Sequence, residues 1–141
     1  MSRQLVVALC SAVVIALLAA VAAVPRAASA SPTVRLASCA HAVSWQTARR
    51  MIGRVATIRG RVAGTHYASS SNGAPTFLNV GVDYPSERRV TVVIWGENRG
   101  RFGAPEVRYR HRTICVRGLV DTYAGVPEIE ATSPAQIFVT R

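Results

Sequence analysis

Apolar and polar residues alternate through most of the chain after residue 53, and this two-residue period predicts β-strands. In the first alternating run Ile58, Gly60 and Val62 share one face, while Arg59 and Arg61 share the other. The pattern predicts strands at residues 54–65, 76–83, 88–95, 112–123 and 127–132, with a short extended segment at residues 135–139. The apolar faces of these strands are expected to form one core.

One short helix is predicted before the first strand, at residues 44–52. Ser44 is a suitable N-cap, and Trp45, Ala48 and Ile52 recur at helical spacing. A longer connection at residues 96–110 is rich in Gly, Pro and Arg, and exceeds a plain hairpin loop. We expect it to dock through a helical turn on three apolar residues, Phe102, Val107 and Tyr109.

A pentapeptide recurs in two of the predicted strands. Ile58-Arg59-Gly60-Arg61-Val62 returns as Val116-Arg117-Gly118-Leu119-Val120. A glycine inside a strand usually marks a bulge, a bend or a close backbone approach. We interpret the two glycines as bend points of a curled sheet; the alternative is that ordinary Val, Arg and Gly composition produced both copies.

The order of three strands, a connecting element and two further strands is that of the five-stranded Greek-key barrel called the OB-fold. The predicted fold class is therefore all-β, an OB-fold barrel with a short N-terminal helix. The predicted domain comprises residues 44–141, preceded by a linker at residues 31–43.

Several short motifs resemble those of bacterial OB-fold domains of the nucleic-acid-binding superfamily. They are Ile58-x-Gly60-x-Val62, Phe77-Leu78-Asn79-Val80-Gly81, Val116-x-Gly118-x-Val120, Tyr123-x-Gly125-x-Pro127-Glu128-Ile129 and Gln136-Ile137. The chain is also similar to the small periplasmic bacterial OB-fold proteins of the cell envelope in its export signal. This resemblance implies binding of small or polymeric ligands without catalysis.

Residues 1–30 have the pattern of a secretory signal peptide. Arg3 precedes an apolar run at residues 5–24, and Ala28-Ser29-Ala30 provides small residues for cleavage. The prediction is a secreted or envelope protein. Two alternatives stay open: the run is long enough to serve as an uncleaved membrane anchor, and Leu36-Ala37-Ser38-Cys39 resembles a lipoprotein signal.

The predicted mature chain is strongly basic. It carries 15 arginines against 7 acidic residues, a formal net charge of +8, and no lysine. Such a charge attracts nucleic acid or other anionic polymers. The preference for arginine over lysine also has a simpler explanation in a GC-rich genome.

Two cysteines, Cys39 and Cys115, remain after Cys10 leaves with the signal peptide. In an oxidising compartment one disulfide between them is expected, with two free thiols or a metal site as alternatives. A metal site is disfavoured because no further ligands stand at local spacing. Cys115 alternates out of phase with Ile114 and Val116, so we expect it outside the barrel.

The candidate binding surface is the outer face of the second and third predicted strands, where OB-folds typically bind. Phe77 and Trp95 would form a stacking platform; the alternative is that both pack beneath the connecting segment. The predicted ligand-binding residues are Arg59, Arg61, Phe77, Asn79, Arg89, Thr91, Trp95 and Tyr123.

The expected function is that of a non-catalytic module for single-stranded nucleic acid or a similar polyanion. The alternative is an envelope or stress-type OB-fold protein that binds another ligand or a protein. A thermonuclease-like enzyme is less favoured, because the seven acidic residues form no recognisable carboxylate–arginine pattern. We expect no catalytic residue, metal or cofactor.

Overall fold

The computed structural model describes residues 38–140. The predicted signal peptide and most of the predicted linker lie outside the described residues. The strands are β1 (Val43–Ser44), β2 (Val55–Tyr67), β3 (Thr76–Val80), β4 (Val90–Ile94), β5 (Thr113–Leu119), β6 (Asp121–Tyr123), β7 (Val126–Glu130) and β8 (Ile137–Val139). The helices are η1 (Trp45–Met51), α1 (Gly96–Phe102), α2 (Pro105–Arg108) and η2 (Pro134–Gln136).

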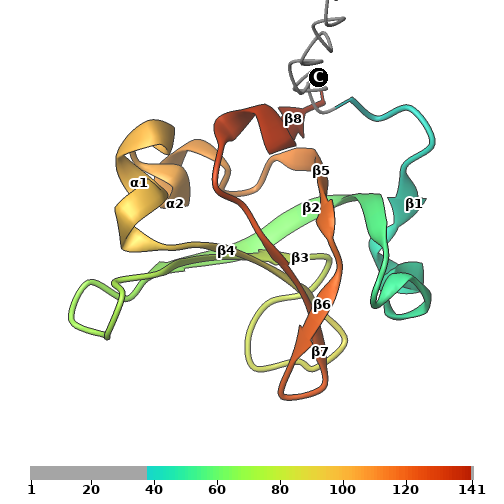
Figure 1. The fold of residues 1–141 in the computed structure, drawn as a ribbon, viewed down its shortest axis with the longest axis horizontal. Coiled ribbons are helices and arrows are strands. Elements are labelled where there is room, and N and C mark those ends of the chain that lie inside the picture. Colours follow the sequence, from blue (N-terminus) through green and yellow to red (C-terminus); the bar gives the residue numbers. More distant parts are fainter. Residues whose placement is uncertain (1–37, 141) are drawn as a thin grey trace, which may run out of the picture. The chain divides into compact units, whose positions relative to one another are not determined.

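The strands follow the order β6-β7-β4-β3-β2-β5-β8, with β1 added beside β2 (Figure 1). The β4–β7 pair is parallel, and β2 is antiparallel to both β3 and β5. The predicted fourth strand forms two strands, β5 and β6, which are divided at Val120. The fold is thus the predicted all-β OB-fold with a short N-terminal helix, although its hydrogen-bonded sheet is not closed.

The division between β5 and β6 at Val120 is explained by its backbone hydrogen bonds. Its N–H donates to the Arg54 carbonyl and its carbonyl accepts from the Gly53 N–H, at 2.9 and 2.8 Å. Both backbone groups are therefore used by the loop before β2. The chain continues through Val120 from β5, which pairs with β2, into β6, which pairs with β7.

The two repeated glycines lie near the points where strands change partners. β2 pairs with β5 up to Arg61 and with β3 from Val62, and a bulge follows Val62. Gly60 directly precedes this switch, as Gly118 precedes the break at Val120. The glycines are not side by side, since Gly60 is opposite Ile114 and Gly118 is opposite Ala56.

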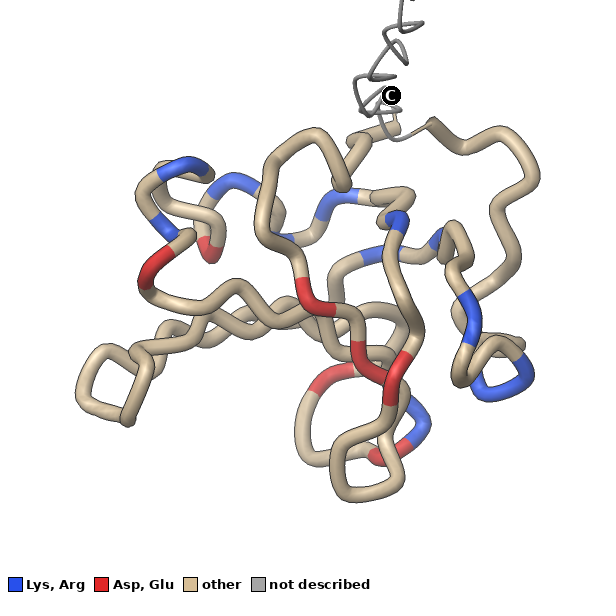
Figure 2. The backbone as a smooth tube through the Cα atoms, in the orientation of Figure 1, with Lys and Arg blue, Asp and Glu red and all other residues tan. Residues whose placement is uncertain are grey.

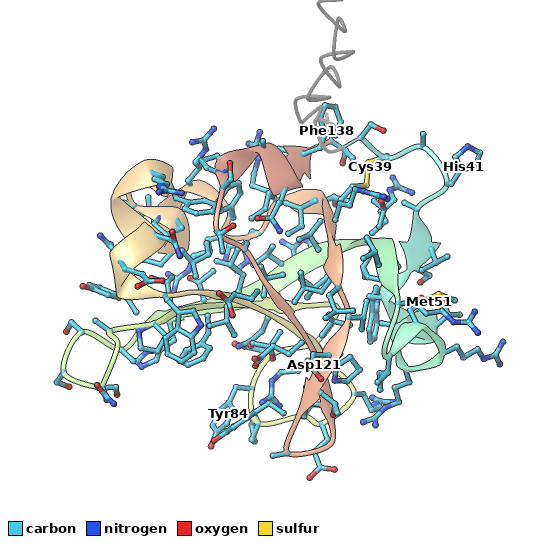
Figure 3. All side chains as sticks on the ribbon, in the orientation of Figure 1. Cys39, His41, Met51, Tyr84, Asp121 and Phe138 are labelled. Carbon is cyan, nitrogen blue, oxygen red and sulfur yellow. A yellow bond between two sulfur atoms is a disulfide. The ribbon has the colours of Figure 1, made fainter. Side chains whose placement is uncertain are left out.

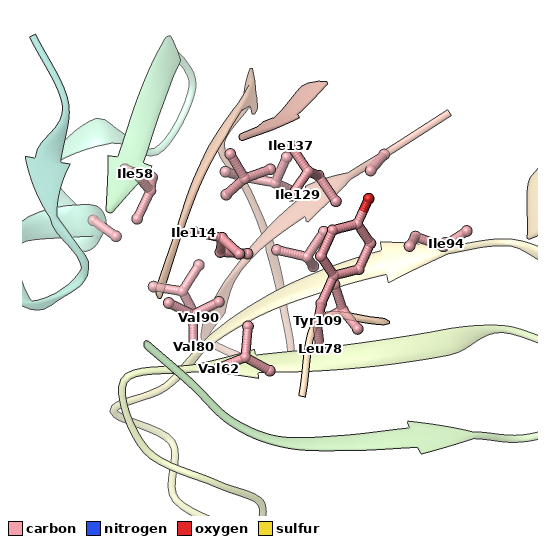
Figure 4. Packing of buried hydrophobic residues seen from close by; sticks show 14 of the residues in the cluster. Ile58, Val62, Leu78, Val80, Val90, Ile94, Tyr109, Ile114, Ile129 and Ile137 are labelled. Atoms are coloured by element: carbon pink, nitrogen blue, oxygen red, sulfur yellow. The ribbon is translucent and has the colours of Figure 1, made fainter. Parts of the chain in front are cut away.

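The inward faces of the strands form the predicted core. Figure 4 shows side chains from β2, β3 and β4 gathering around Ile114 of β5. Fully buried members from these strands are Ile58, Val62, Leu78, Val80, Val90, Val92 and Ile94. Each such side chain contributes about 1.5–3 kcal/mol by leaving water.

The helical elements differ in detail from the prediction. The predicted N-terminal helix is a 3₁₀ helix, capped as expected by Ser44, which accepts from the Gln46 N–H. In the connection Phe102 and Tyr109 are buried as predicted, but Val107 is 73% exposed. The prediction for Val107 was wrong because α2 is a single turn and presents its other side to the barrel.

Cys39 and Cys115 form the predicted disulfide (Figure 3). Cys115 lies outside the core cluster, on the outward face of β5, yet its exposure is 0%. The predicted position outside the barrel core is thus correct, and the residue is nevertheless covered. The bond ties Cys39 to this face, and the neighbouring β8 places Phe138 opposite Cys115.

Candidate ligand-binding pocket

A pocket of about 590 Å³ lies on the outer face of β3 and β4, beside the end of β2 and the β6–β7 hairpin. Its rings are His66, Phe77, Tyr84 and Tyr123, and its other lining residues are Thr65, Asn79, Asp83, Arg89, Thr91, Val126 and Glu128. This is the surface that the sequence predicted for ligand binding.

Strand register explains how distant residues meet there. Asn79 of β3 is opposite Thr91 of β4, and Thr91 is in turn paired with Glu128 of β7. Paired residues in neighbouring strands project to the same face of a sheet. The alternation that buries Leu78 and Val92 in the core therefore directs Asn79, Thr91 and Glu128 to the pocket.

Aromatic rings supply much of the pocket wall. His66 stacks parallel to Phe77, with centroids 6.5 Å apart and an interplanar angle of 2°. Tyr84, in the β3–β4 loop, and Tyr123, at the end of β6, are each 73% exposed. Large rings that line a pocket and remain open to solvent are suited to stacking on a ligand.

The β3–β4 loop is held by two charged residues. Asp83 accepts from the Asn79 side-chain amide at 2.7 Å and from the Tyr84 N–H at 2.8 Å. Arg89 donates to the Ser86 carbonyl at 2.7 Å and to the Thr91 hydroxyl at 3.2 Å. The Arg89 guanidinium also lies 5.3 Å from the Tyr84 ring centroid. These contacts fix Tyr84 at the pocket mouth.

Glu128 is the half-buried carboxylate of the pocket. Burial raises its pKa above the ordinary value, Asp121 and Glu130 raise it further, and Arg89 partly offsets them. Within residues 38–140 the one ion pair is Arg99–Glu106, at 2.7 Å. Glu128 therefore lines the pocket without a protein cation in direct contact.

Most of the acidic residues lie in one region of the fold, where Arg88 and Arg89 accompany them. Five of the seven acidic residues lie near the pocket, in the β3–β4 loop and on β6 and β7: Asp83, Glu87, Asp121, Glu128 and Glu130. Figure 2 shows this group in red on β6, β7 and the neighbouring loop. By contrast Arg59, Arg61 and Arg117 are exposed on the outer face of β2 and β5. We call these three residues the arginine wall.

The pocket brings together five of the eight predicted ligand-binding residues: Phe77, Asn79, Arg89, Thr91 and Tyr123. The other three lie elsewhere. Arg59 borders a separate hollow beside Trp45, and Arg61 belongs to the same wall. Trp95 lies just beyond β4, half-buried against Gly73 of the β2–β3 loop. Trp95 thus does not line this pocket, where the rings beside Phe77 are His66, Tyr84 and Tyr123.

Sequence reasoning missed four important pocket residues: His66, Asp83, Tyr84 and Glu128. Two of them lie in the 83–88 turn region or close to it, where alternation gives no direction for side chains. For Glu128 a signal was present, because it shares a strand face with Glu130. The parallel β4–β7 pairing, which brings that face to the pocket, is a long-range feature.

No family model matches the chain, and no curated protein matches it. Among solved structures it is similar to a putative aspartyl-tRNA synthetase from Leishmania major Friedlin, at 15% identity over 83% of this chain and 23% of that one, with a TM-score of 0.47. An asparaginyl-tRNA synthetase from Entamoeba histolytica has 15% identity over 70% and 23%, with a TM-score of 0.48. The hypothetical protein ygiW from E. coli has 17% identity over 70% and 89%, with a TM-score of 0.44.

The chain thus spans about a quarter of the length of these synthetases. At these identities and TM-scores the likenesses carry no inference about function. In the described part of the chain no helix is long and apolar enough to cross a membrane. Nor do residues 38–140 contain three or more His, Cys, Asp or Glu side chains grouped to hold a metal ion.

Proposed function

We propose that this protein is a non-catalytic binding module that holds a ligand in the aromatic pocket between β3–β4 and the β6–β7 hairpin. The observation that carries this proposal is the pair of open tyrosines. Tyr84 and Tyr123 come from different parts of the chain, line the same pocket and stay 73% exposed. An exposed aromatic group of this kind marks a binding surface more often than a packing one.

The pocket can bind by stacking without forming a covalent intermediate. The two threonine hydroxyls of the pocket are already hydrogen-bonded, Thr65 to the Glu106 carbonyl at 2.9 Å and Thr91 to the Arg89 guanidinium. The volume of about 590 Å³ lies in the usual range for small-ligand sites. We further propose that the protein acts outside the cytoplasm, which agrees with the disulfide and with the predicted signal peptide.

The first test of the pocket uses Phe77. Binding of a single-stranded oligonucleotide, a nucleoside, a saccharide and a small organic cation should be followed by NMR of the disulfide-intact protein. For any ligand that binds the pocket, Phe77→Ala should cost about 1–3 kcal/mol, because stacking on a ring is worth that much.

Phe138→Ala is the matched control, since Phe138 is a partly exposed phenylalanine on β8, at the opposite end of Figure 3 from Tyr84. It should leave binding unchanged. Equal losses in both variants, or no binding by any member of the set, would contradict the proposed pocket.

A second candidate function is binding of single-stranded nucleic acid or a similar polyanion on the arginine wall. The observation that favours it is the separation of charge: Arg59, Arg61 and Arg117 share one exposed face, away from the acidic pocket. Guanidinium groups bind phosphate through two hydrogen bonds. A polyanion would therefore contact the barrel wall rather than the tyrosines.

The arginine wall predicts a strong salt dependence. The logarithm of the binding constant for an oligonucleotide should fall linearly with the logarithm of the salt concentration. The double change Arg59→Ser and Arg61→Ser should make this slope shallower by about 1–2. Arg101→Ser, together with Arg54→Ser, removes the same charge elsewhere on the surface. If both double variants change the slope equally, the wall is not a specific site.

A further inference from the structure

We propose that the aromatic pocket selects an organic cation, such as an alkylammonium group, which would lie between the tyrosine rings and Glu128. This inference rests on the proposed function of the pocket and adds the chemical class of its ligand. It follows from two features that occur together on a protein of net positive charge: aromatic rings, and carboxylates that form no ion pair with a described residue.

The rings provide one half of the recognition. A cation placed over the face of an aromatic ring is attracted by the negative potential of that face, and ammonium groups are held in this way by several rings together. Tyr84 and Tyr123 are open to solvent in the pocket, and Phe77 forms its floor with His66. Tyr84 already has one cation near its ring, the Arg89 guanidinium.

The carboxylates provide the other half. Asp121 of β6 is directly opposite Glu128 of β7, and Glu130 follows two residues later on the same face. Like charges placed directly opposite each other destabilise a sheet. A bound cation would offset this repulsion beyond the partial effect of Arg89, since no described arginine forms an ion pair with any of the three.

The charged side chains nearest to Glu128 form their hydrogen bonds with other groups of the protein. Arg89 is committed to the protein, since it donates to the Ser86 carbonyl and the Thr91 hydroxyl. Asp83 is likewise engaged by Asn79 and by the Tyr84 N–H. Glu128 is thus the pocket carboxylate whose oxygens are not already occupied by a described hydrogen-bond donor.

The positive charge of the whole chain does not prevent binding. Ionic screening at physiological salt acts over about 8 Å, so distant arginines have little influence inside the pocket. The charged groups that act on Glu128 itself are two carboxylates, Asp121 and Glu130, and one arginine, Arg89. An anionic ligand would meet these carboxylates, which is why a phosphate is disfavoured here.

The test compares choline with 3,3-dimethyl-1-butanol, its uncharged isostere, on the full disulfide-bonded chain by NMR titration. Choline should bind about tenfold more tightly at low salt, because the shape is the same and the charge is not. Glu128→Gln should remove most of this difference without changing affinity for the alcohol. Glu97→Gln, an exposed acid on α1 outside the pocket, is the control and should leave the difference intact.

Three outcomes would overturn the inference. Equal affinities for choline and the alcohol would show that charge is not recognised, and loss of selectivity in Glu97→Gln would show that the effect is not local. If thymidine or thymidine monophosphate binds in a Phe77-dependent manner while choline does not, the pocket is a binding site for another class of ligand. Absence of binding by every probe would remove the proposed function as well.

Discussion

At the scale of single residues, a like-charge pair joins β6 to β7 beside the pocket, an arrangement that destabilises a sheet. Asp121 and Glu128 are register partners in an antiparallel hairpin, and the pKa of Glu128 is raised by burial and by its acidic neighbours. A raised carboxyl pKa means that the folded protein holds a proton more readily than the unfolded chain. The ionised form of Glu128 therefore opposes folding at neutral pH.

We expect Glu128→Gln to raise the free energy of unfolding at neutral pH by about 0.2–1 kcal/mol, the usual scale of a cross-strand charge pair. As the pH falls through the raised pKa of Glu128 towards its ordinary value, the wild-type carboxyl takes up a proton and gains stability relative to the variant. The advantage of the variant should then disappear. Urea unfolding at neutral and mildly acid pH measures both effects, and a variant that is less stable at neutral pH would contradict them.

At the scale of elements, β2 determines the architecture because it pairs with β5 over its first half and with β3 over its second. Gly60 lies at this change of partner. A Cβ atom added there would be 2.5 Å from Val80 Cγ1 and 2.9 Å from Trp45 Cδ1. The glycine is thus needed for close approach of β2 to β3 and η1, in agreement with its predicted structural role.

Gly60→Ala should lower the free energy of unfolding by about 1–3 kcal/mol, because an extra methyl group in a packed site forces its neighbours to move. Gly100→Ala makes the same chemical change in α1, where nothing lies within 4 Å of the new atom. Gly100→Ala should raise the free energy of unfolding by about 0.5–1 kcal/mol, because alanine has a higher helix propensity than glycine. Similar losses in the two variants would show that packing at Gly60 is not the cause.

At the scale of the whole molecule, the disulfide connects the segment before β1 to the wall of the barrel. It joins residues separated by 76 positions, and Cys115 is fully buried. Cross-linking so large a loop restricts the unfolded chain and thereby stabilises the folded one. The pocket lies on β3 and β4, beside the β6–β7 hairpin, and does not include either cysteine.

The double variant Cys39→Ala and Cys115→Ala should lose about 4 kcal/mol of unfolding free energy in the chain-entropy account. Denaturant unfolding measures the loss, and intact mass under non-reducing conditions should be two hydrogens below the reduced mass. Ligand binding that depends on Phe77 should persist under all conditions in which the variant is folded. A mass corresponding to two free thiols in the purified protein would remove this prediction.

Local sequence pattern determined most of the elements. The strands, the Ser44 cap, the buried Phe102 and Tyr109 and the disulfide pairing all follow from alternation, helical spacing and cysteine number, which are properties of neighbouring residues or of composition. The error at Val107 arose because α2 is too short for apolar spacing to fix its buried side. The complete burial of Cys115 does not follow from alternation, because Cys39 and Phe138, which lie against it, are distant in sequence.

The sequence by itself determined the core face of each strand and five of the pocket residues, because side-chain direction along a strand has a period of two. Tertiary structure alone decided that Glu128 faces Phe77 and Tyr84 and that Arg59 does not, since parallel pairing of β4 with β7 joins segments more than thirty residues apart. It also decided the charge of each face. In a chain of net positive charge, folding places two carboxylates, Asp83 and Glu128, in the pocket with one arginine, Arg89.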